Sequence, residues 1–131
     1  MNILHYCNNI DIKYGGPSRS VVSLCNALTA LNINISLLTQ FRHSIPINDN
    51  VKLMNFGSGH LVIRFFLFFR YTYTSLKQAD LIHIHGIWDF FHVVLVLWCL
   101  ITRKAYVLQP RGMLEPWSLE QNKIPKLIIF H

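Results

Sequence analysis

Short apolar segments alternate along this chain with longer segments in which apolar residues recur every three or four positions. The short segments, each of strand length, are 3–7, 35–39, 51–56, 81–85 and 105–109. Helical spacing begins after Pro17, returns over 61–78, and covers about 89–102. Strands that alternate with helices predict an α/β fold, a parallel sheet flanked by helices, with ligands bound beyond the carboxyl ends of the strands.

Two of the predicted helices have a distinct apolar face. The first begins at Pro17, which presets φ for a helical turn, and its apolar residues are Val21, Leu24, Cys25, Leu28 and Leu31. On a helical wheel, one side of 61–78 carries Val62, Phe65, Phe66, Phe69, Tyr73 and Leu76. The other side carries Arg64, Arg70, Thr74, Lys77 and Gln78. We expect the aromatic side to pack on the sheet, and the basic side, with Ile63 and Leu67 exposed beside it, suits an acidic lipid surface.

Composition indicates one globular domain over 1–131. Of the 131 residues, 52% are hydrophobic and 14% charged, and no linker-like stretch interrupts them. The longest apolar run, 90–101, is shorter than the roughly 20 residues that cross a bilayer, and the N-terminus lacks a secretory signal pattern. We therefore expect a cytoplasmic protein whose Cys7, Cys25 and Cys99 are reduced and buried.

The chain is basic. Twelve Lys and Arg against six Asp and Glu give a net charge of +6, which favours an anionic partner such as a phosphorylated ligand or an acidic lipid surface. The basic residues stand singly between Lys13 and Lys126, without a run that would follow a nucleic-acid backbone. No nucleic-acid partner is predicted.

The C-terminal segment 117–131 begins with helical spacing that Pro125 is expected to kink or restart. It ends on the apolar residues KLIIFH, with no following element to cover them. An uncovered apolar face at the end of a chain predicts that the sequence is truncated from a longer protein.

The loop YGGPSRS at 14–20 is the first candidate site. Gly15 and Gly16 let backbone N–H groups approach a ligand, the helix N-terminus directs its positive end there, and Arg19 adds charge. The loop is neither a dinucleotide fingerprint nor a Walker loop. The same residues also fit a tight turn with a solvated arginine, and both interpretations stay open.

Two histidines define the second candidate. His83 and His85 lie on the same side of their strand, and His85 stands at its carboxyl end before Gly86. His85 is thus placed to bond a substrate hydroxyl or phosphate, whereas His83, one pleat deeper, is expected to be a core residue. A zinc site needs a third ligand that the pattern does not provide, so no metal is predicted.

Two further loops carry charged candidates. Asp89 fits either an N-cap of the following helix or a ligand-binding role. The turn QPRGMLEPW at 109–117 holds Arg111, whose planar guanidinium suits phosphate or carboxylate, and Glu115. Since the loops at 15–19, 85–89 and 110–115 all follow strands at one predicted edge, we expect them to converge on one site.

The sequence resembles the N-terminal domain of glycosyltransferase family 4 over nearly its whole length. The resembling segments are NILHYC, KYGGPSRSVVSLCNALTALNINISLLT, ADLIHIHGIWDF and YVLQPRGMLEPWSL. The resemblance implies the Rossmann-like N-terminal half of a GT-B fold. Such enzymes transfer a sugar with retention from a nucleotide sugar and need no metal; no cofactor is expected.

By this resemblance Gly15 and Gly16 would lie beside the donor diphosphate, His85 would face the reacting sugar as the catalytic residue, and Arg111 would line the cleft. The implied acceptor is a lipid-linked saccharide or a cell-surface polysaccharide such as a lipopolysaccharide O-antigen. Relatives that extend such acceptors dock on the inner face of the plasma membrane.

One part of the family pattern is missing. The family's second domain carries a donor-binding lysine or arginine and two glutamates spaced eight apart, and Glu115 and Glu120 do not have that spacing. We therefore expect a fragment that lacks the C-terminal domain and is inactive by itself. The alternatives are a non-catalytic module that binds a phosphorylated ligand or partner, and an inert remnant. If activity is regained with a separate C-terminal half, the chain is part of an enzyme. Ligand binding without turnover favours the binding module. Poor solubility favours the inert remnant.

Overall fold

The computed structural model describes the chain except for residues 12, 14–15, 42–45, 58 and 117–131. Within the described part, five parallel strands form one sheet in the order β3-β2-β1-β4-β5. The strands are β1 (Asn2–Cys7), β2 (Asn34–Thr39), β3 (Lys52–Asn55), β4 (Leu81–His85) and β5 (Tyr106–Gln109). The helices are α1 (Gly16–Ala30), α2 (Leu61–Gln78) and α3 (Phe90–Thr102). The predicted α/β class is confirmed.

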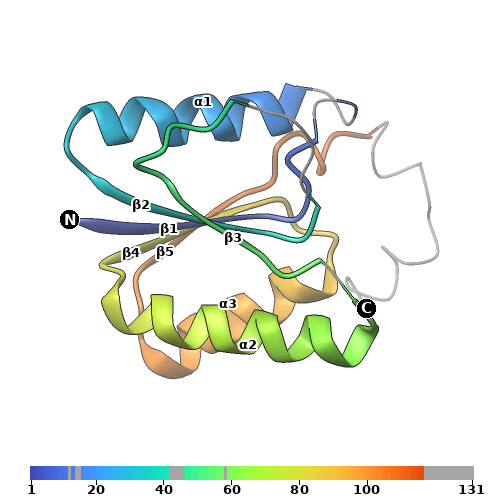
Figure 1. Ribbon diagram of the computed structural model, residues 1–131. Helices are drawn as coiled ribbons and strands as arrows, with labels where there is room; N and C mark the ends of the chain where they lie inside the picture. The colour runs from blue at the N-terminus through green and yellow to red at the C-terminus, as the bar shows by residue number, and fades with distance from the viewer. Residues whose placement is uncertain (12, 14–15, 42–45, 58, 117–131) are drawn as a thin grey trace.

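The sheet has helices on both faces, with α1 on one and α2 and α3 on the other (Figure 1). Because side chains alternate along a strand, β1 contributes to both layers. Leu4 and Tyr6 belong to the core beneath α2 and α3, and Ile3 and Cys7 belong to the core beneath α1. This two-sided burial explains why β1 reads as a continuous apolar run and not as an alternating one.

The larger core is an aromatic cluster beneath α2 and α3. Phe68 of α2 lies 4.6 Å from Phe91 of α3 and 5.2 Å from Phe56, measured between ring centroids. Phe56 and Phe91 are 4.9 Å apart, and Tyr6 of β1 completes the group. The tilted and edge-on ring arrangements are those that aromatic pairs favour. This cluster attaches both helices to the centre of the sheet.

The strand order reverses between β1 and β4. The chain places β2 and then β3 on one side of β1, then crosses through α2 to lay β4 on the other side. The loops that leave β1 and β4 therefore run to opposite faces, which opens a crevice at the carboxyl edge of the sheet. The fold thus fixes the place of a ligand site before any side chain is considered.

The predicted face of α2 was wrong in part: Leu76 is buried and Phe65 packs against the core as expected, but the other four predicted residues are exposed. The residues that the structure buries are Phe68, Thr72, Ser75 and Leu76. Val62, Phe66, Phe69 and Tyr73, expected in the core, are between 42% and 79% exposed. Small side chains at 72 and 75 let the helix approach the sheet closely, and apolar residues surround so much of this helix that their periodicity alone did not select a face. Ile63 is exposed as expected, but Leu67 packs against the core.

The end of α1, the cysteines and the helix lengths test further expectations from the sequence. Leu31 lies beyond α1 and is 70% exposed, so its assignment to the helical face was wrong; the chain turns there through Asn32, whose φ is 58°. Cys7, Cys25 and Cys99 are free and buried, as predicted. In the described ranges no helix combines the length and apolar character needed to span a membrane. The predicted helix at 117–131 lies outside the described residues.

The corrected face of α2 can be tested by two phenylalanine substitutions. Phe68 is fully buried whereas Phe66 is 64% exposed. Phe68→Ala should lower the free energy of unfolding by about 3–5 kcal/mol because it leaves a cavity in the core. Phe66→Ala should change it by about 0.5 kcal/mol or less. Urea unfolding monitored by circular dichroism measures both, and comparable losses would mean that the helix is rotated from this position.

Candidate functional site

A cleft of about 300 Å³ lies at the carboxyl edge of the sheet, where β1 and β4 separate. Four chain segments meet there: the end of β1, the start of α1, the loop between β4 and α3, and the turn after β5. The lining residues are Cys7, Asn8, Asn9, Pro17, Ser18, His85, Gly86, Trp88, Asp89, His92, Arg111 and Met113. This is the edge at which parallel α/β sheets bind their ligands.

The cleft brings together parts of the three loops that the sequence singled out. Pro17 and Ser18 come from the first, His85 and Asp89 from the second, and Arg111 from the third. The expected convergence is confirmed for these residues. Arg19 and Glu115 are described and exposed, but they do not line the cleft. Gly15 lies outside the described residues.

Gly16 is the first residue of α1 and is exposed. A Cβ atom added there would meet no other atom within 4 Å. The first turn of α1 therefore has open space beside its backbone. An anion could approach the unbonded N–H groups at this helix N-terminus, as the sequence suggested.

Arg111 connects three of the segments around the cleft. It has a left-handed backbone with φ of 55°, and Gly112 follows with φ of 75°, so the chain reverses sharply after β5. One guanidinium nitrogen donates to Ser20 Oγ over 2.6 Å. Nε and the other terminal nitrogen lie 3.3 and 2.9 Å from His85 Nδ1. The guanidinium thus fastens the 110–116 turn to both α1 and β4.

His85 is held on its other side by a residue that the sequence did not indicate. Its Nε2 lies 3.0 Å from Nδ1 of His5, a fully buried residue of β1. Burial, the neighbouring histidine charges and Arg111 lower the pKa of His85 to about 2. Burial, His83 and Arg111 lower the pKa of His5 to about 4. Both imidazoles are therefore neutral near pH 7.

His83 is not the core residue that was expected. It is partly exposed, and its Nε2 lies 3.2 Å from Gln109 Oε1 on β5. The described helix on that face, α1, packs on β1 and β2 and leaves the β4 end of the sheet more open. Burial also lowers the pKa of His83, against the opposing effect of Gln109.

His5, His83 and His85 together offer three imidazole nitrogens within 4.8 Å of one another. His5 is the third histidine that the sequence pattern lacked. It stands opposite His83 in the β1–β4 register, so only the pairing of these two strands reveals it. One sequence signal could have found it. His5 has an odd number, as His83 and His85 have, and alternation along paired strands places all three on the same face of the sheet.

Asp89 occupies the N-cap position of α3, but its side chain makes no capping hydrogen bond. Its carboxylate accepts a 2.6 Å hydrogen bond from the Tyr6 hydroxyl and lies 3.4 Å from His92 Nδ1. Burial raises the pKa of Asp89, but the bonds from His92 and Tyr6 outweigh burial and hold that pKa below its usual value. Asp89 is therefore the N-cap residue of α3, as one of the two interpretations expected, and its carboxylate is anchored on the cleft wall by Tyr6.

Gly86 allows the loop after β4 to pass between these groups. Its φ is 100°, and an added Cβ would lie 3.1 Å from His92 Nε2 and 3.2 Å from Met113 Cε. His92 donates from Nε2 to the carbonyl oxygen of His85 over 2.8 Å. A side chain at position 86 would strain the backbone and crowd both neighbours.

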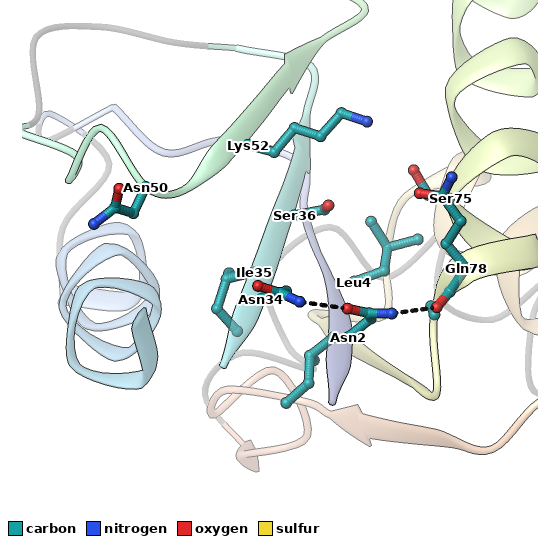
Figure 2. A pocket seen from close by; sticks show the side chains of 11 residues that line it. Asn2, Leu4, Asn34, Ile35, Ser36, Asn50, Lys52, Ser75 and Gln78 are labelled. Atoms are coloured by element: carbon teal, nitrogen blue, oxygen red, sulfur yellow. Dashed lines mark hydrogen bonds between the residues drawn. The ribbon is translucent and has the colours of Figure 1, made fainter. Parts of the chain in front are cut away.

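Two other cavities among the described residues have a different lining, although the second borders the carboxyl-edge cleft at Trp88 and His92. One of about 360 Å³ opens at the amino ends of the strands, where Asn34 donates to Asn2 and Asn2 to the carbonyl of Gln78 (Figure 2). Neither its amides nor Lys52 lies near the predicted site residues. The other, of about 370 Å³, is an almost wholly apolar groove between α3, β5 and the turn after β5. The carboxyl-edge cleft alone combines a guanidinium, imidazoles and a helix N-terminus among the described residues.

Comparison with known proteins gives one match. The model of Glycosyltransferase Family 4 matches residues 14–129, which is most of the chain. No curated protein and no solved structure matches the sequence. The match covers α1, β4 and the Arg111 turn, which are the elements that form most of the cleft.

The low pKa of His5 predicts how stability depends on pH. A histidine with pKa about 4 when folded and 6.5 when unfolded binds more protons in the unfolded chain, so the folded state loses stability as pH falls from 6.5 to 4. The loss due to His5 should reach about 3 kcal/mol. His5→Asn should make this dependence shallower and leave the part that is due to His85, whereas His60→Asn, at an exposed position, serves as the control. Urea unfolding across this pH range measures the slopes, and identical slopes for all three proteins would contradict the assignment.

Proposed function

The chain belongs to glycosyltransferase family 4, and we propose that its carboxyl-edge cleft is the acceptor-side part of a nucleotide-sugar transfer site. The proposed reaction transfers a hexose or N-acetylhexosamine, with retention, to a lipid-linked or cell-surface polysaccharide acceptor. The residues of this chain form one wall of that site. A donor-binding domain that faces this wall completes it.

The position of Arg111 is the observation that best supports this proposal. Its guanidinium stands at the cleft between the start of α1 and His85. A planar guanidinium binds phosphate oxygens with two parallel hydrogen bonds, and the α1 N-terminus adds its partial positive charge beside Gly16. The one carboxylate in the described cleft lining, Asp89, is engaged by Tyr6. Tyr6 takes up part of the acceptor capacity of that carboxylate, and Arg111 and the start of α1 are the groups that would attract phosphate oxygens.

The polar groups around Arg111 suit the remainder of such a substrate. His85 and Asp89 offer acceptors for sugar hydroxyls, and Asn8 and Asn9 add amide groups at the end of β1. In the proposed reaction Arg111 stabilises negative charge that develops on the leaving diphosphate. His85 contacts the reacting sugar through a neutral nitrogen. We assign no general base to this chain, because the leaving phosphate itself can take the acceptor proton.

Binding of a nucleotide sugar to the 131-residue chain tests this proposal. We expect calorimetry to detect millimolar or tighter binding of a uridine diphosphate sugar. Gly16→Val should weaken it by about tenfold or more, because the side chain fills open space beside the phosphate position without a clash in the fold. Ala27→Val, on the exposed side of the same helix, controls for the helix propensity of valine.

A folded chain that binds no nucleotide sugar, or a Gly16→Val variant that binds as the parent does, would count against the diphosphate position. Binding of inorganic pyrophosphate with the same response to Gly16→Val, but no contribution from the sugar or base, would favour the phosphorylated-ligand module. Circular dichroism of each variant establishes that the fold is intact in these comparisons.

We also propose that the outer surface of α2 and α3 contacts a membrane rich in acidic lipid. The two helices lie side by side, with Phe65 5.6 Å from Phe90 and Phe69 5.6 Å from Trp98 between ring centroids. The exposed apolar residues of the two helices, which together form the α2–α3 surface, are Leu61, Val62, Ile63, Phe66, Phe69, Tyr73, Phe90, Val93, Leu97, Leu100 and Ile101. Exposed apolar area on this scale is typical of an interaction site.

The charges beside the α2–α3 surface indicate the partner. Neither helix contains Asp or Glu, whereas Arg70 and Lys77 are exposed on α2 and Arg103 follows α3. Lys77 lies 4.2 Å from the centre of the Tyr73 ring, a pairing of cation and aromatic group that suits the headgroup region. Apolar residues between basic ones are the pattern of a helix that lies in a lipid interface. The basic face, with Ile63 and Leu67 exposed beside it, was expected to serve this role. Ile63 is exposed and Leu67 is not, but the exposed aromatic residues add to the apolar surface.

Sedimentation with phosphatidylcholine vesicles, with and without phosphatidylglycerol, tests the membrane contact. We expect binding that needs the anionic lipid and weakens with salt. Phe66→Ser should weaken binding by about tenfold, because a side chain that is 64% exposed no longer enters the lipid. Leu31→Ser, which removes an equally exposed apolar residue from the far side of the sheet, should leave binding unchanged. Equal losses in the two variants, or binding without anionic lipid, would contradict the assignment to α2 and α3.

A further inference from the structure

We propose that His5 is a positioning residue that, together with Arg111, holds His85 in one tautomer, with its proton on Nε2 and its Nδ1 lone pair on the cleft side. The inference rests on the proposed function for the use that is made of that lone pair. The tautomer itself follows from the hydrogen bonds around the ring and can be measured independently of any ligand.

Arg111 determines the protonation of His85 Nδ1. Two N–H groups of Arg111 point at this atom, over 2.9 and 3.3 Å. A guanidinium keeps its protons in proteins and offers no acceptor. The Nδ1 atom must therefore accept, and a neutral imidazole that accepts at Nδ1 carries its proton at Nε2.

The other ring nitrogen of His85, Nε2, bonds to His5. His85 Nε2 lies 3.0 Å from His5 Nδ1, so the Nε2–H group donates to His5 and the two rings lie nearly parallel, 6° apart. His5 then carries its own proton at Nε2. That atom is buried and has no partner among the described residues, an arrangement that costs free energy. Phenylalanine would fill the position without that cost, so the acceptor at Nδ1 is the feature that requires histidine.

These two bonds leave His85 with one orientation. His5 is fully buried beneath the sheet face and Arg111 stands at the cleft, so the bonds hold opposite sides of the ring. When a phosphate attracts the guanidinium away from His85, Nδ1 becomes a free acceptor directed at the cleft. A sugar hydroxyl can then donate to it without any change in the protonation of the ring.

The charges around the pair favour neutral rings. His85 is faced by Arg111 from the turn after β5, by His5 from β1 and by its strand neighbour His83. All these groups disfavour a proton on Nδ1 of His85. The same bonds oppose metal ligation by His85 in this arrangement, since Nδ1 is covered by a cation and Nε2 carries a proton.

Nuclear magnetic resonance of the full chain with isotope-labelled histidine tests the tautomer. Two-bond proton–nitrogen correlations distinguish protonated from unprotonated ring nitrogens, and His85→Asn assigns the signals of that residue. At neutral pH we expect His85 with Nε2 protonated and Nδ1 bare. We expect the Nε2 proton to be visible because its bond to His5 slows exchange with water. A protonated Nδ1 in the unmodified chain would overturn the proposal without any variant.

Two substitutions at position 5 separate positioning from packing. His5→Phe keeps an aromatic ring, although a larger one, and removes the acceptor, so the His85 Nε2 proton should exchange about tenfold faster or more. His5→Asn keeps an oxygen near the place of Nδ1 and should restore the slow exchange. His83→Asn changes a neighbouring histidine that bonds to Gln109 and not to His85. Because the two rings are in contact, the His85 resonances should shift, but the tautomer and the slow exchange of the Nε2 proton should be unchanged. Equal exchange in the parent and His5→Phe would overturn the role of His5.

The same samples distinguish this inference from the proposed function. Nucleotide-sugar binding is measured separately by calorimetry on the parent chain. If the predicted tautomer and exchange are observed but no nucleotide sugar binds, the positioning role stands and the proposed function fails. If nucleotide sugar binds and His85 is found with Nδ1 protonated, the proposed function stands and the positioning role fails.

Discussion

Parallel pairing of β1 with β4 is the constraint on which both the fold and the site depend. It joins the two halves of the sheet, β3-β2-β1 and β4-β5, and it sets the point at which the connections leave for opposite faces. The register of this pair places His5 opposite His83 and Cys7 opposite His85. The cleft, the histidine cluster and the Tyr6–Asp89 bond all result from this alignment, because each joins β1 to β4 or to the loop that follows it.

The site combines a permanent cation with neutral imidazoles. Arg111 supplies positive charge at every pH, while burial and that same charge lower the pKa values of His5 and His85. Arranged in this way, the histidines act through hydrogen bonds and not through charge, and anionic ligands are attracted chiefly by Arg111 and by the start of α1. The low pKa values carry a cost in stability at acidic pH, which links the chemistry of the cleft to the stability of the whole domain.

The same types of aromatic residue form both the buried core beneath α2 and α3 and the exposed surface of these two helices. Phe68 and Phe91 pack beneath the helices, whereas Phe66 and Phe90 face outward a few positions away. Such a distribution leaves the hydrophobic layer of the domain continuous with an exposed apolar surface bordered by basic side chains. The proposed site for phosphorylated sugars and the proposed lipid-contacting surface thus lie on one small domain, and a lipid-linked acceptor would use both.

The sequence by itself determined the order of strands and helices, the parallel sheet and the edge that carries the site, because those features follow from local periodicity and from turn residues. It also identified His85, Asp89 and Arg111 as cleft residues, since each ends a strand or lies in the loop that follows one. Only the tertiary structure decided which side of α2 is buried, because apolar residues occupy most of that helix and the sheet selects among them by close packing at Thr72 and Ser75. It alone revealed His5, because the distance of 80 residues between His5 and His85 closes only when β1 pairs with β4.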